Sequence, residues 1–187
     1  MRLLIGTRSL FNFGWLQPGL FMLALAGCIS GAQPSASAAE TPAATDPENR
    51  QFDFWLGDWA IADPNGSSEA SSRVSLALGQ YLVVENWDDG RSHKGENLFA
   101  YSADDKTWHG MFADNQGRVH VFTGKVSGGL AEFYGPSRGP AGEAVLNRIR
   151  VVRLAPDRVE QSWEKSADNG GSWTVVFKGE YSRKAGR

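Results

Sequence analysis

The stretch YLVVENWDDG, residues 81–90, carries the pattern that decides the fold. Its first seven residues are rich in β-branched and aromatic side chains, which favour an extended strand. Asp88-Asp89-Gly90 then ends the strand with residues that favour a turn. The same succession of a short strand and a turn recurs along the chain from residue 50 onward.

About ten short strands are predicted from this pattern, at the spacing typical of all-β sandwiches and barrels. They cover residues 59–62, 73–78, 81–87, 97–101, 108–113, 119–126, 131–134, 145–154, 159–166 and 173–183. No segment shows a sustained helical period. Because short turns join consecutive strands, we expect an all-β fold in which an up-and-down antiparallel meander closes into a barrel, since closure removes both exposed edges. A β-sandwich is the alternative.

The composition fits one folded domain at residues 50–187. Six of the seven tryptophans lie in this part, which is enough large apolar surface to fill a core. Without Arg2 and Arg8 the chain has 17 bases against 21 acids, a net charge of −4. That balance, with no basic stripe, does not favour a nucleic-acid partner.

Residues 1–27 are predicted to be a lipoprotein signal peptide. Arg2 and Arg8 are the only charged residues of this segment, and an apolar core over residues 20–26 follows them. Leu25-Ala26-Gly27-Cys28 closes the core and resembles the lipobox of bacterial lipoprotein precursors, in which the cysteine is lipidated and becomes the first mature residue. Lipidation of Cys28, the only cysteine of the chain, would hold the protein to a bilayer, because several acyl chains together bind almost irreversibly.

Two features of the leader leave alternatives open. Ser35-Ala36-Ser37-Ala38-Ala39 has the small residues that ordinary signal peptidase accepts, and cleavage near Ala38 would release a soluble periplasmic or secreted protein. An uncleaved anchor is less favoured, because a spanning helix needs about 20 apolar residues and polar residues interrupt this segment. The residue after the cysteine is Ile29 and not an aspartate. In the lipoprotein sorting pattern that this leader resembles, such a residue favours the outer membrane, with the protein facing the periplasm. Residues 28–49 are rich in Ala, Ser, Pro and Thr, so we expect a flexible tether there.

Two motifs at the ends of the domain carry a resemblance to a known family. They are Gln51-Phe52-Asp53-Phe54-Trp55-Leu56-Gly57-Asp58-Trp59 and Ser166-Ala167-Asp168-Asn169-Gly170-Gly171-Ser172-Trp173-Thr174. The likeness continues through residues 82–87, Trp108 with Asp114, and residues 161–164. The domain resembles an uncharacterised family of bacterial lipocalin-like, calycin-type β-barrels over essentially its whole length. The resemblance implies the barrel and little about function, because the family has no agreed activity.

Gly57-Asp58-Trp59 matches the G-x-W opening of lipocalins. The resemblance implies that Trp59 plugs the closed end of the barrel and that Arg183, from the last strand, stacks on it through a cation–π contact. We interpret these residues as core residues and not as part of a binding site.

Two motifs match enzyme signatures, but the residues around them argue against an enzymatic role. Gly135-Pro136-Ser137-Arg138-Gly139 fits G-x-S-x-G, but a nucleophile elbow needs a helix after the serine and a histidine later in the chain. Neither is present, because Pro140 follows closely and no histidine lies beyond His120. The S-x-D-x-G-x-x-W pattern at residues 166–173 resembles the box of propeller proteins, but it occurs once, so we interpret it as a structural hairpin.

The histidines do not predict a metal site or a haem site. His109 and His120 lie on adjoining predicted strands around the turn at residues 114–117. A two-residue loop places both rings on one face of the sheet, whereas a three-residue loop ending at Gly117 places them on opposite faces. Even on one face they supply two ligands, and a zinc site needs at least three from the protein. Distantly similar haem-binding barrels place their ligand histidine near the C-terminus, where this chain has none. No metal and no cofactor are therefore expected.

Glu85 is the most informative candidate for a ligand-binding residue. The alternation of a strand places Glu85 on the same face as Val83 and Trp87. If it points inward, it must be paired, with Arg148, Arg150, Gln161 and Trp163 as possible partners, or be protonated with a raised pKa. The candidate ligand-binding residues are Tyr81, Glu85, Trp87, Tyr101, His109, Arg150, Gln161 and Trp163.

Three functions are consistent with these features. The favoured one is an envelope-tethered protein that binds a small, largely apolar molecule inside the barrel. The alternative is a structural or interaction module of the cell envelope with a filled barrel and no ligand. The third is a hydrolase or isomerase that uses Glu85 as a general base.

Overall fold

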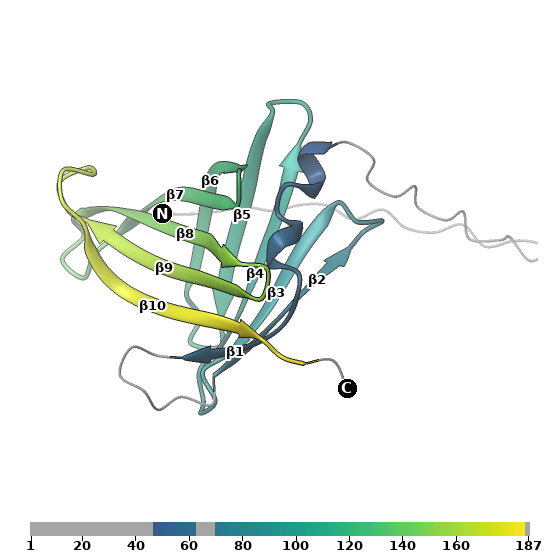
Figure 1. The fold of residues 1–187 in the computed structure, drawn as a ribbon. Helices are drawn as coiled ribbons and strands as arrows, with labels where there is room; N and C mark the ends of the chain where they lie inside the picture. The colour runs from purple at the N-terminus through teal and green to yellow at the C-terminus, as the bar shows by residue number, and fades with distance from the viewer. Residues whose placement is uncertain (1–46, 63–69, 186–187) are drawn as a thin grey trace, which may run out of the picture. The chain divides into compact units, whose positions relative to one another are not determined.

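Ten antiparallel strands form one closed barrel in the computed structural model, which describes residues 47–62 and 70–185 (Figure 1). The strands are β1 (Gly57–Ala62), β2 (Ser71–Ala77), β3 (Leu82–Asp88), β4 (Lys94–Ser102), β5 (Thr107–Asp114), β6 (Val119–Ser127), β7 (Leu130–Arg138), β8 (Ala144–Ala155), β9 (Arg158–Ser166) and β10 (Thr174–Arg183). Two short 3₁₀ helices, η1 (Pro47–Arg50) and η2 (Asp53–Trp55), precede them. Each strand pairs with its neighbours in sequence, and β1 closes the barrel on β10. The predicted up-and-down barrel is confirmed, and the alternative of a β-sandwich is wrong.

The predicted leader and most of the predicted tether lie outside the described residues. Cys28 and the second cleavage site both fall in residues 1–46. The described chain begins in η1, which runs across the expected boundary between tether and barrel at residue 49. Asn49 is buried, and η1 lies against β4, so the chain already packs on the barrel there.

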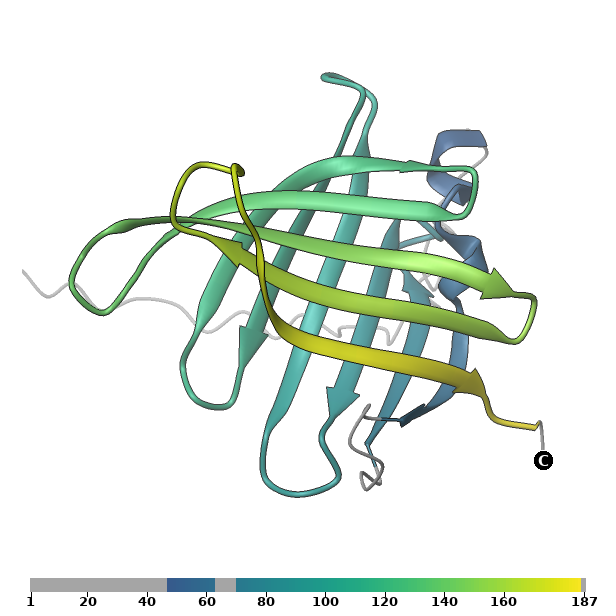
Figure 2. The same cartoon turned by 60° about the vertical axis from the view of Figure 1, so that its left-hand side comes forward.

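The strands alternate buried and exposed residues in the way that the sequence pattern predicts. Along β3, Val83 and Glu85 are buried and Asn86 between Glu85 and Trp87 is exposed. In Figure 2 the strands β3–β5 run steeply and β7–β10 lie across them, while β6 bends from the first direction into the second, where it pairs with β7. These two groups of strands enclose the interior of the barrel.

Aromatic side chains fill one end of the barrel. Phe52 stacks on Trp55 with 4.9 Å between ring centroids and meets the ring of Phe99 at 5.4 Å. Phe99 in turn lies 4.6 Å from Phe133, and all four side chains are completely buried. Because η1 lies against β4 and η2 against β8, the segment before β1 closes this end like a plug.

The contact that the G-x-W motif predicts is present at the seam between β1 and β10. Trp59 pairs with Arg183 across the seam, and the guanidinium carbon lies 4.2 Å from the centre of the indole. Arg183 also donates from Nη1 to the carbonyl oxygen of Leu56 at 2.6 Å. Gly57 has φ +135°, and a Cβ on it would lie 2.1 Å from Arg183 Nη1. The glycine of the motif is therefore required so that the arginine can reach the tryptophan.

The pairing of β6 with β7 stops halfway along the strands. Residues 119–122 and 135–138 lie beyond its last pair. Pro136 has no N–H to donate to a ladder. Gly135 lies so close to Val121 that a Cβ on it would be 2.1 Å from the Val121 carbonyl oxygen. The β6–β7 ladder is therefore interrupted between these strand ends, and a surface groove lined by residues of both strands lies there.

Both motifs that resemble enzyme signatures have structural roles here. Ser137 lies in β7, and the element that follows it is β8 and not a helix. In the hairpin between β9 and β10, Asp168 accepts hydrogen bonds from the backbone N–H of Ser172 at 2.8 Å and from its hydroxyl at 2.7 Å. Trp173 then packs under Arg148, whose guanidinium carbon lies 4.0 Å from its ring. The interpretation of residues 166–173 as a structural hairpin is confirmed.

Replacing Arg183 by leucine should lower the free energy of unfolding by about 1 kcal/mol, because the variant loses an exposed cation–π contact and a hydrogen bond to a carbonyl. Urea unfolding followed by tryptophan fluorescence measures the change. Arg158 on β9 is the matched control, since its ion pair with Glu180 is exposed and its replacement by leucine should cost less than about 0.5 kcal/mol. Equal losses for the two variants would contradict a stabilising role of the seam contact.

Candidate functional site

A cavity of about 290 Å³ lies inside the barrel, beyond the aromatic plug. Its mouth is formed at the end of the barrel where β3 is joined to β4, β5 to β6 and β9 to β10. The cavity is lined by Glu85, Trp87, His93, Asn97, Phe112, Arg118, His120, Ile149, Gln161, Trp163, Lys165, Val176 and Phe177.

The walls of the cavity are aromatic. Trp87 and Phe177 meet edge to face, with 5.9 Å between their ring centroids. Trp163 meets Phe112 in the same manner at 5.1 Å and His120 at 4.9 Å. Burial lowers the pKa of His120, and nearby Lys165 and Arg118 lower it further, so this imidazole is neutral at pH 7. The walls therefore present flat, uncharged surfaces to a bound molecule.

The inner end of the cavity is polar and is centred on Glu85, which is completely buried. Ser72 on β2 donates its hydroxyl to one carboxylate oxygen at 2.8 Å, and Asn97 on β4 donates from Nδ2 to the other at 2.7 Å. Burial raises the pKa of Glu85 to about 7, against the opposing effect of these hydrogen bonds. Glu85 therefore exchanges a proton close to neutral pH.

Tyr181 on β10 joins Glu85 to Gln161 on β9. Its hydroxyl lies 3.4 Å from a Glu85 oxygen and is also hydrogen-bonded to Gln161 Oε1. Burial and the neighbouring carboxylate raise the pKa of Tyr181 further above its ordinary value, so it stays protonated. We call Ser72, Glu85, Asn97, Gln161 and Tyr181 the polar floor of the cavity.

Two buried polar atoms of the cavity lining lack a hydrogen-bond partner within the described part of the chain. They are the Oδ1 atom of Asn97 and the indole Nε1 of Trp87. Buried polar groups in folded proteins are normally hydrogen-bonded, and an unpaired one is costly. One acceptor and one donor are therefore available to a molecule that enters the cavity.

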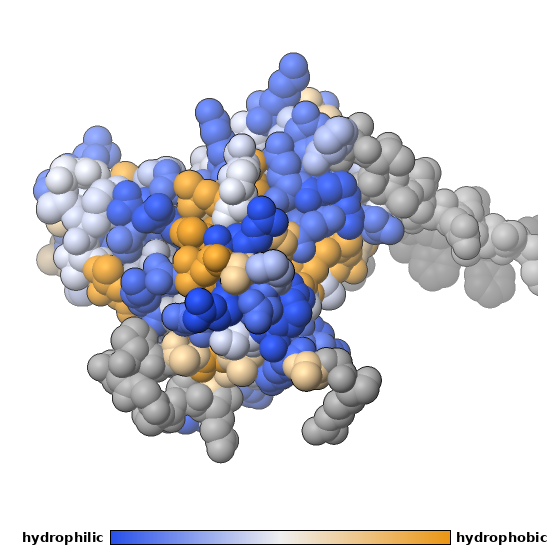
Figure 3. Space-filling view, viewed as in Figure 1, coloured by the Kyte–Doolittle hydropathy of each residue, from blue (hydrophilic) through white to orange (hydrophobic). Residues whose placement is uncertain are grey.

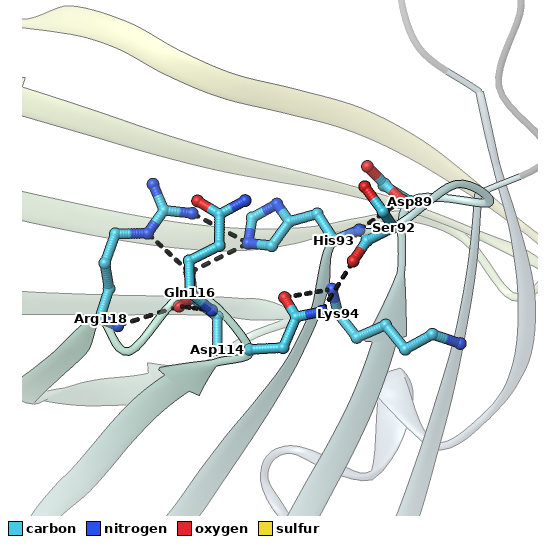
Figure 4. Close-up of polar contacts among 8 residues, drawn as sticks. Asp89, Ser92, His93, Lys94, Asp114, Gln116 and Arg118 are labelled. Carbon is cyan, nitrogen blue, oxygen red and sulfur yellow. Dashed lines mark hydrogen bonds and ion pairs between the residues drawn. The ribbon is translucent and has the colours of Figure 1, made fainter.

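The mouth is organised by Asp114, as Figure 4 shows. Its side chain is fully buried and accepts from Arg118 Nε at 2.6 Å, while His93 Nε2 lies 3.0 Å from the same oxygen. Its other oxygen accepts from the backbone N–H of Gln116 and of Arg118, both at 3.0 Å. Although burial acts in the opposite direction, these hydrogen bonds hold the pKa of Asp114 well below its usual range. Asp114 is therefore a structural anion that fixes the loop between β5 and β6.

The loop between β3 and β4 is tied to the same structure. Asn115 donates from Nδ2 to the Ser92 carbonyl at 2.7 Å and accepts from the Lys94 backbone N–H at 3.1 Å. Asp89 accepts from the backbone N–H of His93 at 3.1 Å (Figure 4). The two loops that frame this side of the mouth are thus held together by hydrogen bonds.

Four of the eight candidate residues lie together in the cavity: Glu85, Trp87, Gln161 and Trp163. The other four are elsewhere. Tyr81 is exposed before β3, and Tyr101 contacts Trp108 at 5.9 Å. His109 is exposed and bound to Asp105, and Arg150 is paired with Glu132.

The suggested pairing of Glu85 with Arg148 or Arg150 is wrong. Ile149 between them is buried, so both arginines lie on the outer face of β8. Arg148 is paired there with Glu164 at 2.6 Å. Gln161, another suggested partner, does lie in the same hydrogen-bonded group as Glu85, and the raised pKa is found as well.

The turn between β5 and β6 settles which way the histidines point. Asp114 accepts at its carbonyl from Gly117 and donates its N–H to the Arg118 carbonyl, so three residues form the loop. Phe112 then pairs with His120, and His109 pairs with Thr123. The three-residue alternative is therefore confirmed: His120 lines the cavity and His109 faces outward.

Sequence reasoning missed further residues of the site, mainly Asn97, Phe112, His120 and Phe177. Asn97 pairs directly with Glu85, and His120 pairs with Phe112. The signal that could have found them is the period of two along each strand, extended across a known hairpin register. That register depends on the lengths of the loops between the strands, which the sequence alone did not determine.

Neither the family models nor the curated proteins compared with this chain gave a match. Within the described residues, no group of three or more His, Cys, Asp or Glu side chains is placed to hold a metal ion. No helix among those residues has the length and apolar character needed to cross a membrane. The function must therefore be argued from the cavity itself.

The buried Glu85 should make stability depend on pH. Because its pKa is raised to about 7 in the folded state, the folded protein holds a proton that the unfolded chain releases near pH 4.5. The contribution of Glu85 is therefore fully present below pH 4.5 and is lost as pH rises to 7, by on the order of 3 kcal/mol. The difference in free energy of unfolding between the wild type and Glu85→Gln, measured from pH 5 to pH 8, should change by most of this amount.

Glu96 provides the control for this measurement. It is exposed on β4, beside Asn97, so Glu96→Gln should differ from the wild type by a nearly constant amount over the same pH range. A constant difference for Glu85→Gln as well would refute the raised pKa.

Proposed function

We propose that this protein binds a small, largely apolar organic molecule in the barrel cavity. The observation that carries the proposal is the combination of aromatic walls with a buried polar floor in a space of about 290 Å³. Ligand pockets are typically apolar cavities with a few placed polar groups that orient the ligand. The volume lies at the lower end of the range known for such pockets, about 300–1,000 Å³, which favours a compact ligand.

The cavity weighs against the alternative of a filled structural barrel. Small barrels without a ligand are packed by their own side chains, as the aromatic plug packs the other end here. The unpartnered atoms of Trp87 and Asn97 also fit a ligand better than a finished core. On the face shown in Figure 3, hydrophobic residues form separate patches among hydrophilic ones, which gives little support to a broad interaction surface there.

An isomerase or hydrolase that uses Glu85 as a general base is the second candidate. A carboxyl group with a pKa of about 7 at the end of a cavity favours it, because a general base works best near the operating pH. The completely buried carboxylate accepts from Ser72 and Asn97, so this role requires a substrate proton that reaches the floor. Binding is required by both candidates and is therefore the property to test first.

We also propose that the barrel is held to a bacterial envelope through lipidated Cys28. The support is the lipobox-like Leu25-Ala26-Gly27-Cys28 after an apolar core. The favoured location is the outer membrane, facing the periplasm. Release after cleavage near Ala38 is the competing possibility.

Full-length protein purified from the envelope of a bacterial host should carry a bound small molecule, seen in native mass spectrometry as an added mass that is lost on denaturation. Trp163→Leu should weaken binding of that molecule by about tenfold, because one aromatic wall is removed. Trp173→Leu is the matched control, since Trp173 packs under Arg148 and is not part of the cavity lining. Bare polypeptide from the native envelope, or equal effects of the two variants, would contradict the proposal.

Cys28→Ser should abolish fatty acylation of the exported chain, detected by intact mass and by incorporation of labelled palmitate. The wild type should carry the acyl mass on an amino-terminal cysteine. Ala38→Leu tests the competing possibility, because it blocks the second cleavage site and should leave acylation unchanged. A mature wild-type chain that begins after residue 38 without acyl mass would exclude the lipid anchor.

A further inference from the structure

The polar floor indicates the chemical class of the ligand, an inference that rests on the proposed binding function. Glu85 is completely buried, the neutral groups of Ser72 and Asn97 donate to it, and the neutral hydroxyl of Tyr181 lies 3.4 Å away. Within the described residues no Lys, Arg or His forms an ion pair with it. A buried carboxylate without a cation is strongly unfavourable, so it is either protonated or neutralised by a bound cation.

The unpartnered oxygen of Asn97 beside Glu85 identifies the complementary atoms of a ligand. Asn97 is buried, with 4% of its surface exposed, and its Nδ2 already donates a hydrogen bond to Glu85. Its Oδ1 can only accept. Together with the carboxylate oxygens it forms a set of acceptors, which is matched by a group with several N–H donors. An ammonium group has three such donors.

The aromatic walls suit a positive charge as well as an apolar body. Trp87 and Phe177 come from β3 and β10, and Phe112 and Trp163 come from β5 and β9, so rings line the cavity from separate parts of the barrel. The faces of such rings attract cations, and tryptophan does so most strongly. A carboxylate or phosphate group could accept from the indole N–H of Trp87, but it would be repelled by the carboxylate of Glu85.

We propose that the cavity binds a small organic amine in its protonated form. The ammonium group lies toward Glu85 and Asn97, and the apolar body lies between Trp87 and Trp163. Amines that are compact enough for about 290 Å³ are the expected class.

The charged groups near the mouth do not cancel the attraction of the floor. Arg118 is paired with Asp114, and His93 contacts the same carboxylate. His120 is neutral at pH 7 because burial lowers its pKa. Lys165 is exposed to water, where its charge is screened. Tyr181, the other titratable group facing Glu85, stays protonated because its pKa is raised.

Three indoles of similar size test the proposal by calorimetry on the full chain: tryptamine, which is a cation, tryptophol, which is neutral, and indolepropionate, which is an anion. At pH 8 tryptamine should bind about tenfold or more tightly than tryptophol, and indolepropionate should bind least. At pH 6 the advantage of tryptamine should shrink, because Glu85, with a pKa of about 7, is then mostly protonated. Equal or tighter binding of tryptophol, or no binding of tryptamine, overturns the amine assignment.

Glu85→Gln should remove the advantage of tryptamine over tryptophol, whereas Glu96→Gln, on the exposed face of β4, should retain it.

A measurement on the wild type tests the same assignment if Glu85→Gln does not fold. Near pH 7 tryptamine should release about half a proton on binding, seen as a dependence of the heat on the buffer, because the cation favours the carboxylate form of Glu85. Release of no proton overturns the assignment.

The native mass spectrum keeps this test separate from the test of binding itself. A bound neutral or anionic molecule from the envelope would overturn the amine assignment and leave the binding function in place. A bare polypeptide together with no binding of any indole would overturn both.

Discussion

The closure of β1 on β10 is the constraint on which the rest of this structure depends. Side chains on a strand point alternately to the two faces of the sheet, so a fixed register decides for every residue whether it lies inside or outside. The seam pairs Trp59 with Arg183, and Gly57 leaves room for the guanidinium group over the indole. With the seam fixed, residues from β2, β3, β4, β9 and β10 meet at one place inside the barrel and form the polar floor.

The interior is divided into three parts with different physical roles. The plug of Phe52, Trp55, Phe99 and Phe133 is tightly packed and gives the barrel its main core. The polar floor separates this core from the cavity and holds a carboxyl group that water does not reach. Low-dielectric surroundings strengthen the hydrogen bonds of such a network when all its polar groups are paired. The same surroundings make an unpaired polar group costly for stability. The unpartnered Asn97 oxygen thus marks the side of the floor where an acceptor is left for the proposed ligand.

The sequence predicted the fold more completely than the site, and particular residues explain the difference. Strand and turn signals are local: Asp88-Asp89-Gly90 ends a strand by its own conformational preferences, and all ten predicted strands are found. Trp163 and Glu85 were found because each stands out within its own strand. Asn97 and His120 were not found, because their position depends on the register between two strands, and one additional loop residue inverts it. Arg150 was misplaced for a related reason, since only the burial of Ile149 shows which face of β8 points outward.

The interrupted pairing of β6 with β7 has a consequence for the behaviour of the protein at high concentration. Free strand edges can recruit a strand from another molecule and begin aggregation. Here Pro136 stands on one of the two free edges and offers no N–H to an incoming strand. Arg138 adds a positive charge at the end of the β7 edge, which opposes the approach of a second copy. The barrel can therefore keep an interruption in the β6–β7 ladder and still resist edge-to-edge association.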